Sequence, residues 1–449
     1  MKLRSRLAVF FAKLVYKAST RLKRGSGSSL PGRIAACIEP EILSELSCMV
    51  RRKIIVVTGT NGKTTTNGIL THVLEAHGLK VISNRLGANL PDGVVSAFVL
   101  AADTRGGIDA DYACIEVDEL STESVFSRLR PDCVIVTNIF RDQMDRIGEV
   151  DTVSKRIQAA LKHVPEAELV INGDDVCSRL LADCCGNPVT TYGLDEKLAE
   201  NLPTGPREIV FCPACGARLK YDLVQYAQLG IWHCPACGFH RLRPDISAAD
   251  LHFDGCYSFT LAGTPMRTPI REPYNVYNTL AAYAALWILG APRSNFRPVI
   301  EQFDFGNDRE NTFTVNGTHV QLFLAKNPVG FQQKLFLIRQ DPKPKDVFIQ
   351  INDTKLDGED ISWLWDVDYD ALSDASVETV TVGGIRGGDM GLCLKYEGIP
   401  CRYATDILHT IRDLTLQGSR NLYIVTNYSG LYRTGRMLQG LQSVGKGGW

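Results

Sequence analysis

A glycine-rich turn between a short apolar run and a predicted helix constrains the fold of this chain more than any other feature. Residues 57–66 read Val-Thr-Gly-Thr-Asn-Gly-Lys-Thr-Thr-Thr and overlap the end of the β-branched segment Ile54–Val57. A helix is predicted over Thr64–His77, where Gly78 ends it. Glycines let the backbone turn so that its N–H groups face phosphate oxygens, and the positive N-terminus of the helix points at the same anion. The pattern therefore predicts a nucleotide-binding loop in an α/β fold.

The residues of this loop have predicted roles in binding ATP. Lys63 is expected to reach the terminal phosphates, and Thr64 is expected to ligate Mg²⁺. The loop is a variant, because Val57 stands where the general phosphate-loop pattern has a glycine. A glycine turn that binds no nucleotide is the alternative, and the position between a strand and a helix argues against it. The residues predicted to surround the nucleotide here are Gly59, Thr60, Asn61, Gly62, Lys63, Thr64 and Thr65.

Strand and helix patterns alternate along most of the 449 residues, which suffice for about two or three domains. This alternation predicts an α/β fold with a mainly parallel sheet covered on both faces. Residues Gly290–Asn311 are interpreted as a linker to a second α/β segment that begins at about 312. The further elements expected are strands at Val81–Ser83, Tyr112–Val117, Asp132–Thr137, Leu169–Ile171, Val347–Ile351, Val377–Val382 and Leu422–Val425, and an alanine-rich helix at Tyr274–Leu289.

Three acidic residues stand at the end of the predicted strand Tyr112–Val117, namely Glu116, Asp118 and Glu119. In open α/β sheets the carboxyl ends of the strands line the ligand crevice. Mg²⁺ prefers one or two carboxylates together with phosphate oxygens and water. A carboxylate of this group is therefore expected to bind the metal, while Asp118 and Glu119 are equally well explained as loop acids or helix N-caps.

Two Cys-Pro-Ala-Cys-Gly turns interrupt the α/β pattern within about 207–245. Cys212 and Cys215 form the first pair, Cys234 and Cys237 form the second, and 18 residues separate the pairs. Four thiolates with this spacing predict a structural Zn²⁺ ribbon that leaves no open position for a catalytic water. An iron–sulfur or redox dithiol site is the alternative. Two Cys-x-x-Cys pairs in a large α/β-like chain fit metal binding in a reducing compartment better than a secreted disulfide scaffold, so we expect a cytoplasmic location.

The first 38 residues contain nine Lys or Arg and no acidic residue. The apolar run Leu7–Phe11 is too short to span a membrane, because Lys13 and Lys17 follow it closely. We favour a helix packed on the next domain with a basic outer face. An amphipathic helix at the surface of anionic lipid is the alternative. The net charge of −1 for the whole chain argues against a nucleic-acid partner.

The loop sequence Gly-Thr-Asn-Gly-Lys-Thr-Thr resembles the signature of Mur ligases and folylpolyglutamate synthases. Thr137-Asn138, followed by residues 141–146 (Arg-Asp-Gln-Met-Asp-Arg), is similar to a second Mur motif, in which Gln143 replaces a His. The resemblance implies that Glu116 binds Mg²⁺ and that Asn138 and Asp142 lie near the nucleotide and metal. Tyr274-Asn275-Val-Tyr-Asn278 followed by Ala281-Ala282 resembles the Mur helix beside the adenine, which implicates Asn275 and Asn278. A further Mur linker motif, around Asp308-Arg309, matches only loosely.

A Mur-type core with a four-cysteine insertion resembles the MurT family, the synthetase subunits of lipid II isoglutaminyl synthase. Matching stretches include Leu30-Pro-Gly, Asn84, Gly87-Ala-Asn89, Ala325-Lys-Asn-Pro328 and 352–363. The resemblance implies a basic segment at 1–48 packed on the central domain. It further implies a central ATP-binding domain at 49–300 with the zinc ribbon inserted, and a Rossmann-like C-terminal domain at 312–449. The implied cofactors are ATP, Mg²⁺ and structural Zn²⁺, and the implied partner is a GatD-type class I glutaminase in a heterodimer.

Asp353, Asp357 and Asp360 crowd the loop after the predicted strand Val347–Ile351, and Trp363 follows them. By the same resemblance, Asp360 matches an aspartate that reaches into the glutaminase active site and orients its His, with Asp353 as the second candidate. A solvated acidic loop is the alternative.

The resemblance implies ATP-dependent amidation of the D-glutamate α-carboxylate of the lipid II stem peptide, in peptidoglycan biosynthesis. The product is D-isoglutamine, formed through an acyl-phosphate with ammonia from the partner. Lys63, Glu116 and Asp360 are the predicted catalytic residues. Two other hypotheses stay open: a stand-alone ligase that adds an amino acid, and a zinc-ribbon scaffold whose nucleotide site only regulates assembly.

Overall fold

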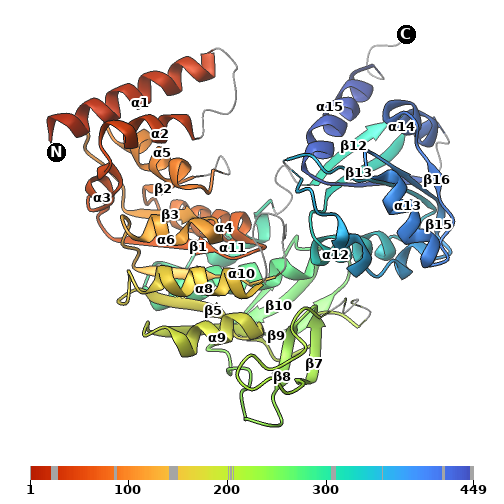
Figure 1. Ribbon diagram of the computed structural model, residues 1–449, viewed down its shortest axis with the longest axis horizontal. Helices are drawn as coiled ribbons and strands as arrows, with labels where there is room; N and C mark the ends of the chain where they lie inside the picture. Colours follow the sequence, from red (N-terminus) through yellow and green to blue (C-terminus); the bar gives the residue numbers. More distant parts are fainter. Residues whose placement is uncertain are drawn as a thin grey trace.

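The computed structural model has two lobes that diverge like the arms of a V (Figure 1). It describes residues 2–21, 29–84, 88–140, 150–200, 202, 205, 207–304, 310–355, 357–416 and 420–444. The N-terminal helices lie at the end of one arm, the inserted hairpin lies near the base, and the C-terminal sheet forms the other arm (Figure 1).

A nine-stranded sheet forms the first lobe, in the order β11-β10-β9-β6-β5-β4-β1-β3-β2. β1 (Lys53–Thr58) lies near its centre, between β3 (Tyr112–Glu116) and β4 (Cys133–Val136), and pairs in parallel with both. The predicted parallel sheet is confirmed from β2 to β9, whereas β10 and β11 extend it with antiparallel pairing that the sequence patterns did not indicate. The other strands are β2 (Val81–Ser83), β5 (Glu168–Asn172), β6 (Val189–Leu194), β9 (Ile246–Phe253), β10 (Tyr257–Leu261) and β11 (Thr264–Arg267).

Helices cover both faces of this sheet, as the continuous apolar strands predicted. Side chains of β1 alternate between the faces, so Ile55 and Val57 pack toward one cluster while Ile54 and Val56 pack toward the other. The first face is covered by α4 (Lys63–Ala76), α10 (Pro273–Ile288) and α11 (Phe296–Gln302). The second face is covered by α5 (Pro91–Ala101), α6 (Thr122–Phe126), α8 (Val150–Leu161) and α9 (Val176–Cys184).

The interpretation of Gly290–Asn311 as a plain linker is wrong in part, because α11 lies within it. Phe296 and Ile300 of α11 are buried in the same cluster as α4. Pro298 falls in the first turn of this short helix, where a missing N–H costs no hydrogen bond.

The second lobe is a six-stranded sheet, in the order β12-β13-β17-β14-β15-β16. Only the β12–β13 pair is antiparallel. Its strands are β12 (Glu310–Val315), β13 (Thr318–Leu324), β14 (Lys345–Gln350), β15 (Val377–Gly383), β16 (Arg402–Tyr403) and β17 (Asn421–Thr426). Its helical elements are α12 (Pro328–Gln340), η2 (Ser362–Asp366), η3 (Asp370–Ser373), α13 (Gly387–Tyr396), α14 (Ile407–Leu416) and α15 (Tyr428–Val444).

The N-terminal segment forms α1 (Leu3–Arg21), α2 (Leu30–Ile38) and α3 (Ile42–Ser47). α1 packs on α2 and α5 of the first lobe. The expectation of a basic outer face is wrong in part, because exposed Leu and Phe side chains occupy the middle of that face. Among the described residues, no helix is both long enough and apolar enough to cross a membrane.

Candidate functional site

The phosphate loop connects β1 to α4 in a conformation that requires its two glycines. Gly59 and Gly62 have φ values of 121° and 88°, which side-chain-bearing residues rarely adopt. A Cβ on Gly59 would lie 2.3 Å from Thr137 Oγ1, and one on Gly62 would lie 2.0 Å from Asn278 Oδ1. The loop is therefore held tightly between β4 and α10.

Asn138 fixes the backbone of the loop from behind. Its side-chain Nδ2 donates to the carbonyl of Asn61 at 3.0 Å, and its Oδ1 accepts from the backbone N–H of Asn61 at 3.0 Å. Thr60 Oγ1 also accepts from the N–H of Phe140 at 2.9 Å. Asn138 is buried, so its place in this structure is that of a loop support.

The two residues predicted to bind Mg²⁺ lie together at the start of α4. Thr64 Oγ1 donates to Glu116 Oε2 at 2.9 Å, and Asn89 Nδ2 donates to Glu116 Oε1 at 3.2 Å. Asn84 receives the N–H of Glu116 at 2.9 Å and fixes the end of β3. A hydroxyl and a carboxylate oxygen side by side beside a phosphate loop suit the oxygen-ligand chemistry of Mg²⁺.

Lys63 is turned away from the pocket and bound by Glu119, which the sequence left as a loop acid or N-cap. Its Nζ lies 3.1 Å from Glu119 Oε2 and also donates to the carbonyls of Gly59 and Thr60. Asp118, in contrast, is an N-cap that accepts from the N–H of Leu120. Burial raises the pKa of Glu119, and the neighbouring Lys63 ammonium opposes that rise. Glu119 is therefore a site residue that sequence reasoning missed.

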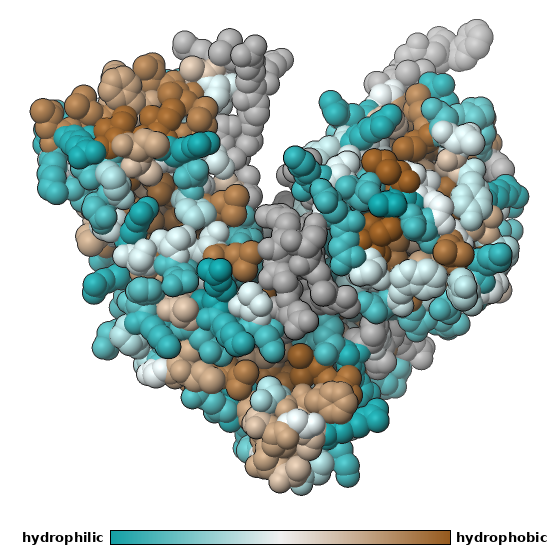
Figure 2. Space-filling model, in the orientation of Figure 1, coloured by the Kyte–Doolittle hydropathy of each residue, from teal (hydrophilic) through white to brown (hydrophobic). Residues whose placement is uncertain are grey.

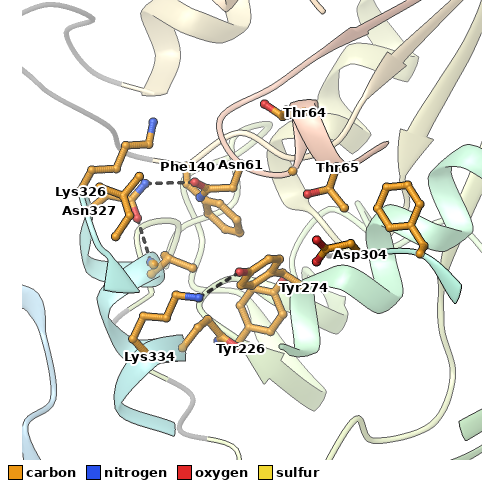
Figure 3. A pocket seen from close by; sticks show the side chains of 16 residues that line it. Asn61, Thr64, Thr65, Phe140, Tyr226, Tyr274, Asp304, Lys326, Asn327 and Lys334 are labelled. Carbon is orange, nitrogen blue, oxygen red and sulfur yellow. Dashed lines mark hydrogen bonds between the residues drawn. The ribbon is translucent and has the colours of Figure 1, made fainter. Parts of the chain in front are cut away.

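A pocket between the two lobes begins at this loop (Figure 3). The first lobe contributes Asn61, Thr64 and Thr65 together with four aromatic side chains, and the second lobe contributes the start of α12 and the residues before it. Asn327 Nδ2 lies 3.4 Å from Asn61 Oδ1, which joins the lobes directly at the loop. The aromatic residues are Phe140, Tyr226, Tyr274 and Phe303, and the polar residues facing them are Asp304, Lys326, Asn327, Gln333 and Lys334. Apolar rings beside a phosphate loop suit a purine base and its phosphates.

The helix expected beside the adenine presents Tyr274 to the pocket, whereas Asn275 and Asn278 lie behind the loop. Both asparagines are buried and are not among the lining residues. Asn278 Nδ2 donates to Asn275 Oδ1 at 2.9 Å, and Asn275 Nδ2 donates to Glu272 Oε2 at 3.1 Å. Their direct contact with a nucleotide stays a prediction.

The four cysteines of the two knuckles converge to a single point. Their Sγ atoms all lie within 4.8 Å of one another, and the closest contacts are 3.6 Å (Cys212–Cys237) and 3.5 Å (Cys215–Cys234). A tetrahedral Zn²⁺ with Zn–S bonds of about 2.3 Å needs sulfur–sulfur separations of roughly 3.8 Å. The cluster therefore fits a closed structural zinc site.

The hairpin of this ribbon, β7 (Lys220–Tyr226) and β8 (Leu229–His233), is anchored on the first lobe. Trp232 Nε1 donates to the carbonyl of Asp174 at 3.0 Å, and Gln228 Nε2 donates to the carbonyl of Ile139 at 2.8 Å. This anchoring places Tyr226, at the end of the hairpin opposite the cysteines, on the wall of the pocket. The cysteine spacing alone could not reveal that contribution.

The acidic loop after β14 lies outside the residues that line the pocket. Asp353 pairs with Arg386 at 2.7 Å, and Asp357 accepts from the N–H of Ser429 at 2.8 Å. Asp360 is partly exposed and accepts from the N–H of Ser362 at 2.8 Å, at the start of η2. The predicted motif at 141–146, with Asp142 and Gln143, and the residues Asp308 and Arg309 lie outside the described part of the chain.

Comparisons with known proteins identify the family to which this chain belongs. Residues 57–211 match the family model of the Mur ligase middle domain, and residues 324–431 match that of the MurT ligase C-terminal region. The chain is 31% identical, over 99% of both chains, to lipid II isoglutaminyl synthase (glutamine-hydrolyzing) subunit MurT from Streptococcus pneumoniae. It is 34% identical to the same subunit from Staphylococcus aureus, over 86% of this chain and 87% of that one.

Two solved structures share the fold at low identity. A pseudomurein peptide ligase type C from Methanothermus fervidus has a TM-score of 0.68 and 19% identity, covering 87% of this chain and 79% of that one. MurF from Acinetobacter baumannii has a TM-score of 0.66 and 16% identity, covering 92% and 80%. These likenesses confirm the predicted Mur-ligase type of α/β fold.

Proposed function

Because the chain belongs to the MurT family of Mur-ligase-like synthetase subunits, we propose that it amidates a lipid-linked peptidoglycan precursor with ATP. The reaction converts the D-glutamate α-carboxylate of the lipid II stem peptide to D-isoglutamine. The observation that supports this most strongly is the identity to the curated subunits along nearly the whole chain, ribbon and C-terminal domain included.

The first step forms a mixed anhydride. A carboxylate oxygen attacks the γ-phosphorus of ATP, the bond to the bridging oxygen of ADP breaks, and an acyl-phosphate results. Lys63 exchanges its contact with Glu119 for the terminal phosphate oxygens, where its charge stabilises the transferring group. Thr64 and Glu116 would hold Mg²⁺, which neutralises phosphate charge when bound.

The second step uses ammonia. Its nitrogen attacks the acyl carbon, the bond to phosphate breaks, and the amide forms with loss of a proton. In the proposal a GatD-type class I glutaminase supplies this ammonia by hydrolysing glutamine. The activation step is required because a free carboxylate is a poor electrophile at neutral pH.

We place the partner on the C-terminal lobe, next to the acidic loop. Exposed apolar side chains gather there on η2, the loop before α13, α13 itself and β16. Trp365 and Tyr396 pack edge to face at 5.5 Å, and Gly391 of α13 lies directly against Tyr403. Trp365, Tyr396 and Tyr403 are exposed on this lobe, as are Ile385 and Leu392, and in the proposal Asp360 reaches from here to the glutaminase His. The reaction then belongs in the cytoplasm, at the inner face of the membrane where a lipid-linked precursor is accessible.

The test is reconstitution with the candidate glutaminase, lipid II, ATP and glutamine, followed by mass spectrometry of the stem peptide. The proposal predicts the mass of a carboxylate-to-amide exchange only when both subunits are present. D360N should abolish glutamine-dependent amidation while free ammonium salt still supports it, and D370N, an exposed acid on η3, should change neither. Phosphate release driven by an added amino acid without a glutaminase would instead favour the stand-alone ligase. ATP binding without any turnover would favour the scaffold.

A further inference from the structure

α1 exposes an apolar stripe at the far end of the first lobe. Leu3, Leu7, Phe10, Phe11 and Leu14 are spaced i, i+4, i+7, i+8 and i+11, so they lie on one side of the helix. Each is between 43% and 75% exposed. The hydrophobic surface that gathers at the top of this lobe in Figure 2 lies where Figure 1 places α1.

The opposite side of α1 is packed, so the stripe has a fixed orientation. Ala8, Val9 and Ala12 are fully buried in the cluster that includes α2 and α5. Ser5 Oγ donates to Glu45 Oε2 at 2.6 Å, and Lys13 Nζ donates to the carbonyl of Leu100 at 3.2 Å. The exposed Leu and Phe side chains therefore lie on the solvent-facing side of a helix whose other side is packed against the protein.

Basic residues border the stripe on both sides. Arg6, Lys13 and Lys17 follow one border at helical spacing, and Arg4 lies on the other. α1 contains no acidic residue, although the chain as a whole has a net charge of −1. Within the described part of the chain, neither Arg6 nor Lys17 forms an ion pair. Arg4 lies 3.9 Å from Glu39 and Lys13 donates to the carbonyl of Leu100, so the positive charge that the described residues leave unpaired at this surface is that of Arg6 and Lys17.

We infer that α1 binds the surface of an anionic lipid bilayer, with its apolar stripe inserted at the level of the headgroups. An amphipathic helix with aromatic and Leu side chains on one face and Lys or Arg at the borders has the chemistry of an interfacial helix. Long basic side chains can extend to the phosphates while the apolar stripe enters the acyl boundary. A protein partner of neutral or basic surface would leave these charges uncompensated.

The placement of α1 also suits the reaction, a point that rests on the proposed function. The two lobes diverge toward the side on which α1 lies (Figure 1). A bilayer against α1 would therefore face the open side of the V, from which a membrane-anchored stem peptide can enter. The lipid-binding surface itself does not depend on which acid is activated.

Vesicle co-sedimentation of the full chain tests the inference without any catalytic step. The chain should bind vesicles that contain phosphatidylglycerol and bind pure phosphatidylcholine more weakly. F10S/L14S should lower binding to the anionic vesicles by about tenfold, and R6Q/K17Q should remove the preference for them. L416S, at an exposed leucine on α14 of the other lobe, is the control and should leave binding unchanged.

Equal binding of the wild type and F10S/L14S, or no binding by the wild type, would overturn the inference. Sedimentation velocity tests whether the stripe instead binds a second copy of the chain. If the wild type self-associates, F10S/L14S abolishes this self-association, and vesicle binding is unchanged, the inference is also overturned. Circular dichroism melting shows whether the variants are folded. Amidation of a lipid-free stem peptide should be the same in F10S/L14S and wild type, so a failure of the proposed function remains distinguishable.

Discussion

Replacing Gly62 by alanine tests how the phosphate loop is held against α10. Gly62 has a φ of 88°, and an added Cβ would lie 2.0 Å from Asn278 Oδ1 and 2.8 Å from Asn278 Cγ. Asn278 cannot yield easily, because it is buried and hydrogen-bonded to Asn275. G62A must therefore shift either the loop or the asparagine pair.

The expected magnitude has two parts. A left-handed φ at a residue with a Cβ costs about 1–2 kcal/mol. Displacing Asn278 from its buried hydrogen bond adds about 1–3 kcal/mol. Gly78, at the other end of α4, is the matched control: its φ is 74°, and no atom lies within 4 Å of an added Cβ. G78A should show only the first part, so G62A should exceed it by about 1–3 kcal/mol.

Calorimetric unfolding of G62A, G78A, N278A and the double variant G62A/N278A measures this difference. The three atoms nearest to the added Cβ all belong to the Asn278 side chain beyond its own Cβ, so N278A removes the clash. The double-mutant cycle should give a favourable coupling of about 1–3 kcal/mol. ATP affinity should fall in G62A and stay near wild type in G78A. Equal destabilisation by G62A and G78A, or a coupling of zero, would refute the reasoning.

Four further predictions concern charge and metal. K63A should lower ATP turnover by about a hundredfold or more while K80A, an exposed lysine on the same lobe, should not, as measured by phosphate release. C234S should abolish bound zinc, from about one ion per chain by elemental analysis, and lower the melting temperature, whereas C256S should do neither. Burial raises the pKa of Glu119 and the Lys63 ammonium opposes that rise, so MgATP binding that draws Lys63 away should raise this pKa further and cause proton uptake over the pH range in which Glu119 titrates. Calorimetric titration with MgATP in buffers of different ionisation enthalpy should show this proton uptake in the wild type. The same uptake in E119Q would contradict the assignment of the proton to Glu119. In the free protein, burial raises the pKa of Glu119 above its value in the unfolded chain. The free energy of unfolding should therefore be higher at acid pH and should fall as pH rises through the folded-state pKa of Glu119. E119Q should remove this pH dependence.

Local patterns sufficed for the central strands and the loop because those segments obey short-range rules. β1 and α4 lie within a residue or so of the predicted ranges, since an apolar run, two glycines and an apolar helix period define them. The sequence patterns did not predict β9, because buried and exposed side chains do not alternate regularly along it and Asp250 has a positive φ. β9 is a strand because it pairs with β6, which is distant in sequence, and with β10, whose pairing contains a β-bulge.

The site was predictable where a local motif or the end of a predicted strand marks its residues. Thr64 and Glu116 were named as partners, and the structure brings them into contact. Glu119 and Tyr226 were missed, because their roles arise from a buried contact and from a hairpin folded back on the lobe. Asn278 was placed beside the base by resemblance, whereas packing against Gly62 sets its position here. These contacts depend on the tertiary structure, which the spacing of residues along a single sequence does not reveal.

The central claim is that this chain activates the substrate carboxylate as an acyl-phosphate before ammonia attacks. The most direct test labels the glutamate α-carboxylate of lipid II with oxygen-18, supplies ATP, glutamine and the glutaminase partner, and analyses the released phosphate by mass spectrometry. Carboxylate oxygen attacks phosphorus in the proposed step and leaves with phosphate when the amide forms. Oxygen-18 is therefore expected in the inorganic phosphate, in proportion to the amide produced. Amide formation with unlabelled phosphate would contradict it.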